Sequence, residues 1–311
     1  MAEGEKTWRQ RVGLNPARLG GRIPYVHRFG IGTLEAAVIS DGPLALPPAA
    51  AIHPGLPQAE VEAALAEAFV PAGPLRIEQN ILLVDLGGHL VLFDDGMGDS
   101  KLFGPDSGRL VRSLAELDLA PAQIDALVLS HAHSDHCWGT IRPDGTPAFP
   151  NAMIYMAEHE LAFWEHYPGS DRDRTVAGVR RHLLPLRERM LFIRDGEEFL
   201  PGLHAIAAPG HTPGHMAFVV ANAGEALCVL GDAAFLHPIS FAHPAAHSAF
   251  DTEPEVAAAT RARLLGRLAD ERMRLIGYHA PWPGLGHVLR AQGGGAGGGF
   301  RYVPEAAAPK P

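Results

Sequence analysis

Three histidines and an aspartate fall within six residues at His131-Ala-His133-Ser-Asp135-His136, directly after the apolar stretch 124–130. Ionisable side chains at this density are costly to bury unless they are paired. Imidazole and carboxylate groups are the usual protein ligands of zinc, and they also suit iron and manganese. On a tight loop, residues 131 and 133 can turn toward one ion and residues 135 and 136 toward a second. The motif therefore predicts a metal site.

Three more residues of ligand type follow predicted strands later in the chain. His211 lies in the Pro- and Gly-rich turn 209–215, Asp232 ends the apolar run 226–232, and His279 ends a third such run. A carboxylate such as Asp232 could bridge two ions and neutralise their mutual repulsion. A single histidine after a strand is more often a core or surface residue. Together with the first motif, however, the three residues predict a site for two metal ions.

Composition narrows the choice of partners and compartment. The chain has 311 residues and a formal net charge of −9, which argues against nucleic acid as a partner. Its two cysteines, Cys137 and Cys228, are far apart and form no disulfide framework, so we expect a reduced, cytoplasmic protein. We read Cys137 as a buried thiol rather than a metal ligand. No uninterrupted apolar run approaches ~18 residues, so we expect no membrane span.

The ligand candidates must be positioned by the elements around them, and apolar periodicity indicates those elements. Strands are predicted at 35–40, 77–86, 89–96, 124–130, 152–157, 190–195, 204–209, 216–222, 226–232 and 273–279. Helices are predicted at 58–69, 108–119, 158–167, 175–190 and 254–269. Strand pairs with helices between them, repeated in the second half, predict two sheets packed face to face with helices outside. This is a four-layer αββα sandwich in the α/β class.

The remaining segments define the expected domain organisation. Residues 1–30 lack clear periodicity and are interpreted as an N-terminal arm that contacts a partner subunit or closes the pocket. Residues 31–311 are interpreted as a single catalytic domain with a Gly-rich C-terminal tail, which begins at 292–299. The Pro- and Ala-rich stretch 43–57 is expected to be an ordered loop.

The order of these motifs resembles the metallo-β-lactamase superfamily, over about residues 30–303. The resemblance rests on HAHSDH, the isolated His211, the Gly-Asp pair at 231–232 and the late His279, with FDDG at 93–96 similar to an early Asp-x-Gly turn. Within the superfamily the chain is most similar to the branch that includes methyl parathion hydrolase and lactonase-like enzymes. That similarity is carried by ISDG (39–42), EQNILLV (78–84), FDDGMG (93–98), FDTEP (250–254) and GYHAPWPGLGH (277–287).

The resemblance implies the αββα fold, a binuclear site at the edge of the sheets and a role for each ligand residue. The implied ligands are His131, His133 and His211 for the first metal, Asp135, His136 and His279 for the second, and Asp232 between them. The implied cofactor is a pair of divalent ions, with zinc preferred over manganese, iron or cobalt. Asp94 would orient a ligand histidine from behind. His215 could be a hydrogen-bond partner of a ligand residue, although a packing or surface role is equally compatible with its position.

The expected chemistry is hydrolysis. Two divalent cations that share a water molecule lower its pKa to about 7, and the resulting bridging hydroxide attacks a carbonyl carbon or a phosphorus. Asp232 and Asp135 are the candidate catalytic residues, and Asp232 would steady the hydroxide and pass its proton to the leaving group. The resemblance favours a lactone or ester, with an acyl-homoserine-type lactone first, and a phosphotriester second. An amide of the β-lactam type is less favoured.

The substrate pocket is expected beside Asp232. The segment 234–250 follows it directly and is rich in Phe, Pro and His, which suits a pocket wall, although a packed connection to the next helix is an alternative. The pocket candidates are Phe241, His243, Phe250 and Trp282. They predict a neutral and fairly hydrophobic small molecule as substrate. We also expect a homodimer.

The main alternative from another class is a mononuclear iron enzyme that resembles persulfide dioxygenases. Such a protein shares the HxHxDH pattern but holds one metal. The complete second set of Asp135, His136 and His279 argues against it.

Overall fold

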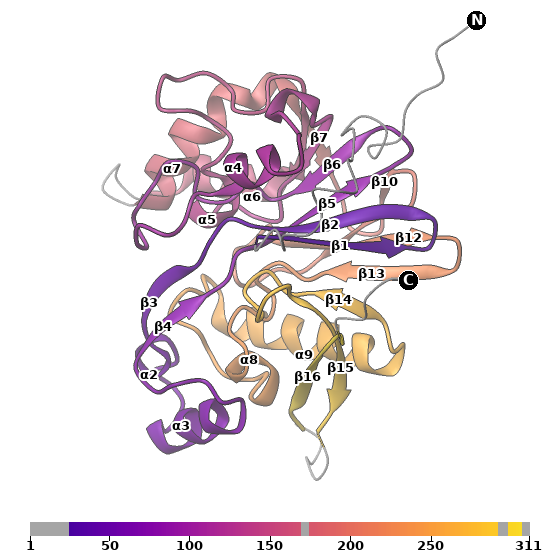
Figure 1. Cartoon of the computed structure of the whole chain (residues 1–311). Coiled ribbons are helices and arrows are strands. Elements are labelled where there is room, and N and C mark those ends of the chain that lie inside the picture. The colour runs from indigo at the N-terminus through magenta and orange to yellow at the C-terminus, as the bar shows by residue number, and fades with distance from the viewer. Residues whose placement is uncertain (1–24, 169–173, 292–297, 307–311) are drawn as a thin grey trace, which may run out of the picture.

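Two seven-stranded sheets form the centre of the protein (Figure 1). The computed structural model describes residues 25–168, 174–291 and 298–306. The first sheet contains, in spatial order, β1 (Val26–Ile31), β2 (Leu34–Ser40), β5 (Asn80–Asp85), β6 (Leu90–Phe93), β7 (Ala126–Val128), β8 (Met153–Ala157) and β9 (Met190–Ile193). The neighbours from β1 to β6 are antiparallel, and those from β6 to β9 are parallel.

The second sheet follows the first in sequence. Its spatial order is β10 (Glu198–Leu200), β11 (Leu203–Ala207), β12 (Met216–Asn222), β13 (Glu225–Val229), β14 (Arg274–Ile276), β15 (Leu285–Arg290) and β16 (Phe300–Pro304). All of its neighbours are antiparallel except β13 and β14. The parallel pair needs a crossover connection, and that connection carries α9 (Pro254–Asp270).

The strands are apolar on both faces because both faces are covered. On β5, Leu82 and Val84 point into a layer shared with Phe218 of β12, while Leu83 points to the outside of the first sheet. That outer face is covered by α4 (Leu110–Ala115), α6 (Glu158–His166) and α7 (Arg174–His182). The outer face of the second sheet packs against α9. The predicted αββα sandwich is confirmed.

A small two-stranded sheet lies beside the sandwich. Its strands β3 (Leu44–Pro48) and β4 (Pro74–Ile77) are antiparallel, and this sheet packs with α2 (Ala49–Ile52), α3 (Gln58–Glu67) and α8 (Ile239–Ala242) (Figure 1). The prediction of a loop at 43–57 is therefore wrong over residues 44–52, which form β3 and α2. Leu44 and Leu46 are buried on alternate positions of β3, a strand pattern that the surrounding prolines obscured.

Three other predicted boundaries change. β1 occupies residues 26–31, so the end of the predicted arm is a strand of the first sheet, and residues 1–24 lie outside the described residues. The Gly-rich segment does not begin a tail, because β16 follows it and pairs with β15. The predicted helix 175–190 is divided into α7 and the 3₁₀ helix η3 (Leu184–Arg189), which has Pro185 in its first turn.

The remaining short elements are the 3₁₀ turn η2 (Pro121–Gln123) and α5 (Ser134–Cys137), which lies inside the histidine motif. Among the described residues, no helix has the length and apolar character needed to cross a bilayer.

Candidate metal centre

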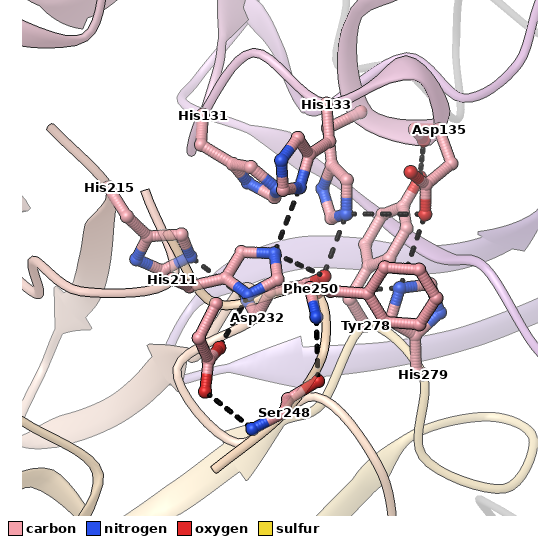
Figure 2. Close-up of polar contacts among 12 residues, drawn as sticks. His131, His133, Asp135, His211, His215, Asp232, Ser248, Phe250, Tyr278 and His279 are labelled. Atoms are coloured by element: carbon pink, nitrogen blue, oxygen red, sulfur yellow. Dashed lines mark hydrogen bonds and ion pairs between the residues drawn. The ribbon is translucent and has the colours of Figure 1, made fainter. Parts of the chain in front are cut away.

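The seven ligand candidates meet at one edge of the sandwich, where strands of both sheets end. The motif 131–136 follows β7 of the first sheet and runs into α5. His211 lies between β11 and β12, Asp232 follows β13, and His279 follows β14, all in the second sheet. Figure 2 shows His131, His133 and Asp135 approaching from one side and His211, Asp232 and His279 from the other. Each half of the molecule therefore supplies part of the same site.

The first cluster contains three imidazoles, those of His131, His133 and His211, whose nitrogens lie within 4.8 Å of one another. The Nδ1 atom of His133 is 3.0 Å from the Nε2 atom of His211. All three rings are oriented edge-on to one another, with centroid separations of 4.7–4.9 Å. Three imidazole nitrogens converge on one point.

The second cluster contains Asp135, His136 and His279, again within 4.8 Å. The Oδ2 atom of Asp135 lies 3.2 Å from Nε2 of His279 and 3.5 Å from Nε2 of His136. These separations match ligand atoms that share an ion. Two ligands about 2.1 Å from a tetrahedral ion are about 3.4 Å apart.

Asp232 lies between the two clusters and is shared by them. Its Oδ2 atom is 3.3 Å from Nε2 of His211 in the first cluster. Its Oδ1 atom is 3.4 Å from Nε2 of both His136 and His279 in the second. One carboxylate thus presents one oxygen to each cluster.

Unpartnered buried atoms indicate what this arrangement is built to hold. Nε2 of His131, Nε2 of His136 and Oδ1 of Asp232 are all buried and have no hydrogen-bond partner among the described residues. Leaving such atoms unpaired costs about 1–3 kcal/mol each. A divalent cation in each cluster would pair them. The donor set of imidazoles and carboxylates therefore fits two such ions.

The electrostatics of the site also favour bound cations. Burial and the neighbouring imidazoles lower the pKa of His133 to about 3, so this ring is in the neutral form that binds metals. Burial alone would lower the pKa of His279, but the carboxylates of Asp232 and Asp135 raise it to about 9. Asp232 is buried too, yet His279 and His136 hold its pKa well below the usual value. The carboxylates are ionised and attract positive charge.

Contacts behind the ligands fix the orientation of their rings. Asp94 lies behind His136, with its Oδ2 atom 2.8 Å from Nδ1 of that ring. The hydroxyl of Ser130 is 2.9 Å from the same Oδ2 atom and 3.0 Å from Nδ1 of His131. The backbone carbonyl of Glu78 lies 2.7 Å from Nδ1 of His279. These contacts leave the opposite ring nitrogens of all three histidines directed into the clusters.

The structure places His215 behind Asp232. Its Nε2 atom accepts a hydrogen bond from the backbone N–H of Asp232 at 2.9 Å. Of the two roles that the sequence allowed, the geometry supports contact with a ligand residue.

Besides Ser130, the sequence analysis missed three supporting residues, Glu160, Asp251 and Arg261. Glu160, in the first turn of α6, accepts hydrogen bonds from the backbone N–H groups of Ala132 (2.9 Å) and Gly214 (3.0 Å). Asp251 contacts His211, and Arg261 contacts Asp251. An acidic residue in a helix and an arginine in an amphipathic pattern carry no local signal of this role. For Asp251 the only signal was its place in FDTEP.

A cavity of about 430 Å³ opens above the two clusters. His133, Asp135, His211, Asp232 and His279 form its polar floor. Its walls are mainly apolar and come from separate elements, including Leu44 and Leu46 of β3, Trp164 of α6, Phe103, Phe235 and Phe250.

Of the four predicted pocket residues, three do not line this cavity. Phe250 lines it. Phe241 does not, because α8 turns its ring into the core beneath α9, where it packs 5.6 Å from the Tyr302 ring. Trp282 packs against the cluster between the sheets, and His243 lies 3.8 Å from the exposed Glu60. The predicted wall at 234–250 is thus a pocket wall only at its ends, through Phe235 and Phe250.

Comparisons with known proteins agree with this geometry. The family model described as the metallo-beta-lactamase superfamily matches residues 76–279. An N-acyl homoserine lactonase of Bacillus cereus is 24% identical over 188 residues, which span 58% of this chain and 69% of that protein.

Two solved structures are similar over almost the whole chain. The first is AidC, described as a dizinc quorum-quenching lactonase in complex with a product. It is 26% identical, with a TM-score of 0.82 over 92% of this chain and 99% of its own. The second is the hydrolase AbOPH, described as a member of the beta lactamase superfamily. It is 25% identical, with a TM-score of 0.83 over 93% of this chain and 100% of its own.

Proposed function

Because this chain belongs to the metallo-β-lactamase superfamily, we propose that it is a metal-dependent hydrolase that opens the ring of a small, neutral lactone. An acyl-homoserine-type lactone is the first candidate substrate. The observation that carries the proposal is the position of Asp232, whose carboxylate faces both ligand clusters at the floor of a cavity with mainly apolar walls.

The cofactor we propose is a pair of zinc ions. His131, His133 and His211 would hold one, Asp135, His136 and His279 the other, and Asp232 both. When bound, such ions supply Lewis acidity, which acidifies a water molecule and polarises the substrate carbonyl.

The protein's own groups handle the proton. Hydrolysis of a lactone joins a water oxygen to the carbonyl carbon, breaks the bond between that carbon and the ring oxygen, and leaves a proton on the released alkoxide. Asp232 is ionised, since its pKa is held well below the usual value. We propose that it takes the proton released by the water through an oxygen that is not held by an ion at that moment, and passes that proton to the ring oxygen. The pKa of Asp135 is also lowered, because His136 and His279 outweigh its burial, so it stays anionic beside the reacting groups.

The cavity supports a neutral substrate with an apolar part. Its walls are mainly aliphatic and aromatic, so an apolar substituent of the substrate would bury its surface against them. The lactonases of Bacillus cereus and AidC support the same substrate class. The two-cluster arrangement counts against a mononuclear iron enzyme.

A substrate panel with parallel metal analysis tests the proposal. Zinc-loaded protein is assayed against acyl-homoserine lactones, aryl esters, phosphotriesters and a β-lactam, with Asp232→Asn as a matched control. We expect two ions per chain and the highest kcat/KM for lactones. A preference for phosphotriesters would replace the substrate class while keeping the metal centre. A single iron per chain, or an unaffected Asp232→Asn enzyme, would overturn the proposal.

The domain organisation and the assembly stay proposals as well. We propose that the chain from β1 onward acts as one catalytic domain and that the protein forms a homodimer through the N-terminal arm before it. Light scattering on the full chain and on a chain that begins at Tyr25 tests the second point. A monomer in both cases would contradict it.

A further inference from the structure

Arg261 of α9 is almost fully buried, at 1% exposure, and lies directly behind the metal centre. Together with Asp251 it connects α9 to His211. We propose that Asp251 and Arg261 are positioning residues that hold His211 in the orientation and tautomer required by the first metal ion. This inference rests on the proposed metal assignment and adds a pair of residues to it.

The guanidinium of Arg261 makes four hydrogen bonds, all to one stretch of chain. Its Nε atom donates to the carbonyl of Ala233 (3.0 Å), and Nη1 donates to the carbonyls of Pro244 (3.0 Å) and Ala246 (2.7 Å). Its Nη2 atom donates to Oδ2 of Asp251 at 3.1 Å. A buried arginine thus organises the segment between Asp232 and α9.

Asp251 uses its two oxygens for different partners. Oδ2 accepts from Arg261 and from the backbone N–H of Ser248 at 3.1 Å, while Oδ1 lies 3.0 Å from Nδ1 of His211 (Figure 2 shows His211 and Ser248). An ionised carboxylate can only accept, so Nδ1 of His211 must carry the hydrogen. When the ring is neutral, as a metal ligand must be, its lone pair is then on Nε2, which faces the first cluster.

The backbone strengthens the same connection. Thr252 donates its N–H to the carbonyl of His211, and Glu253 donates to the carbonyl of Gly210, both at 2.9 Å. A Cβ atom on Gly210 would lie 2.1 Å from the backbone nitrogen of Ala257 in α9. The loop that carries His211 is therefore seated on the start of α9, next to Asp251.

The pair acts on one side of the centre. Behind the second cluster, His136 is supported by Asp94 and His279 by the carbonyl of Glu78. Loss of Asp251 should therefore weaken the first metal ion selectively. Loss of a carboxylate behind a ligand histidine typically weakens metal affinity by about 10–100-fold.

Metal retention in zinc-loaded protein tests the inference. Asp251→Asn keeps the size of the side chain but replaces one oxygen by an NH2 group, which cannot accept a hydrogen bond. The variant therefore loses its contact with either His211 or Arg261. Arg261→Lys keeps the charge but cannot make four directed bonds. The matched control is Arg267→Lys on the same helix, where the arginine contacts only the exposed Glu271 among the partners that the structure gives. Each protein is equilibrated against chelators of graded strength, and the zinc per chain is measured.

We expect two release steps in the unmodified protein. In Asp251→Asn and Arg261→Lys, one ion should leave at an affinity of the chelator for zinc about 10–100-fold lower than the unmodified protein requires, while the other ion is retained. Excess zinc should restore kcat. The cobalt-substituted variants should show a changed visible spectrum for one ion only. Arg267→Lys should match the unmodified protein.

The outcomes separate this inference from the proposed function. If the unmodified protein does not hold two ions, the proposed metal centre fails. If it does and Asp251→Asn retains both ions normally, the positioning role is overturned. Equal weakening of both ions, or loss of the folded state in Asp251→Asn, would assign the pair a purely structural role and would overturn the inference as well.

Discussion

The amide nitrogen of Gly214 lies 3.0 Å from the Oε2 atom of Glu160, and the two residues are packed backbone against backbone. The other oxygen of Glu160 accepts from the N–H of Ala132, which stands between His131 and His133. One buried carboxylate therefore joins the loop after β7 in the first sheet to the His211 loop in the second. Nε1 of Trp164 also donates to this carboxylate, at 2.8 Å.

Gly214→Ala should disturb this junction. A Cβ at this position would lie 2.3 Å from the backbone nitrogen of Glu160, so the His211 loop must shift. We expect a loss of about 1–3 kcal/mol in stability and at least tenfold in kcat/KM. Thermal unfolding and kinetics measure both. Gly55→Ala, where a Cβ meets nothing within 4 Å, is the control. Equal behaviour of the two variants would contradict the role of the close contact.

Asp232→Ala should abolish turnover while the fold is kept. Its carboxylate is the one that faces both clusters, and its removal leaves two cations poorly neutralised. We expect a loss of ~10²-fold or more in kcat, the scale seen when an electrostatic contact to a reacting centre is removed. Circular dichroism checks the fold. Near-normal turnover with both metals bound would refute the assignment.

Phe250 and Phe241 should respond differently to truncation. Phe250 lines the cavity, so Phe250→Ala should change the relative kcat/KM among lactones of different acyl length by about tenfold. Phe241 is buried beneath α9, so Phe241→Ala should instead lower stability by about 3–5 kcal/mol with little change in relative kcat/KM. The two variants serve as controls for each other. A selectivity change in Phe241→Ala alone would reverse the assignment of the wall.

Removal of metal should destabilise the protein. The ligand set brings two ionised carboxylates and five imidazoles to one point, and cations that bind only the folded chain stabilise it. With free zinc at about 1,000 times its Kd, that stabilisation is about 4 kcal/mol. Thermal unfolding before and after chelation, and again after zinc is returned, measures it. An unchanged Tm after complete metal removal would argue against the site.

Stability should fall at mildly acidic pH partly through His182. Burial, with a contribution from Arg181, lowers the pKa of His182 to about 4, from 6.5 in the unfolded chain. Between these values the unfolded chain binds a proton that the folded chain does not, so stability falls as the pH falls through this window. Allowing for solvent screening, the expected contribution is about 1–2 kcal/mol.

A variant isolates that contribution. His182→Phe can keep the stack on Trp138, whose ring lies 5.5 Å away, and cannot be protonated. Its stability should decline less steeply than that of the unmodified protein between pH 6.5 and 4. His89→Phe, at an exposed position, is the control. Parallel pH dependence in all three proteins would exclude His182 as a source.

The fold and the candidate ligands could be predicted because both depend on patterns of neighbouring residues in the sequence. Apolar runs of strand length predicted the sheets, and each ligand candidate directly follows such a run. Three histidines as close in sequence as His131, His133 and His136 are too costly to bury in a core without partners, so they indicated a site. Strand ends of a layered fold lie at a common edge, so candidates far apart in sequence could be grouped before their contacts were known.

The residues that sequence reasoning misplaced depend on long-range packing. Phe241 lies in a short helix whose direction is fixed by contact with β16, about sixty residues later, and not by its own periodicity. Glu160, Asp251 and Arg261 belong to helices or turns with ordinary composition. Only tertiary contact distinguishes them from surface charges. β3 was hidden because proline weakens the strand pattern that Leu44 and Leu46 would otherwise give.

The division of the site between the two sheets has a kinetic consequence. The side chains of Asp135 and His279 lie 3.2 Å apart, although all strands from β8 to β14 lie between the two residues in the sequence. Contacts of such long sequence separation form only after the entropy of closing the intervening loop has been lost. We therefore expect tight zinc uptake during refolding to follow the docking of the two halves, so that a zinc-sensitive dye would report the final assembly of the chain and not its early collapse.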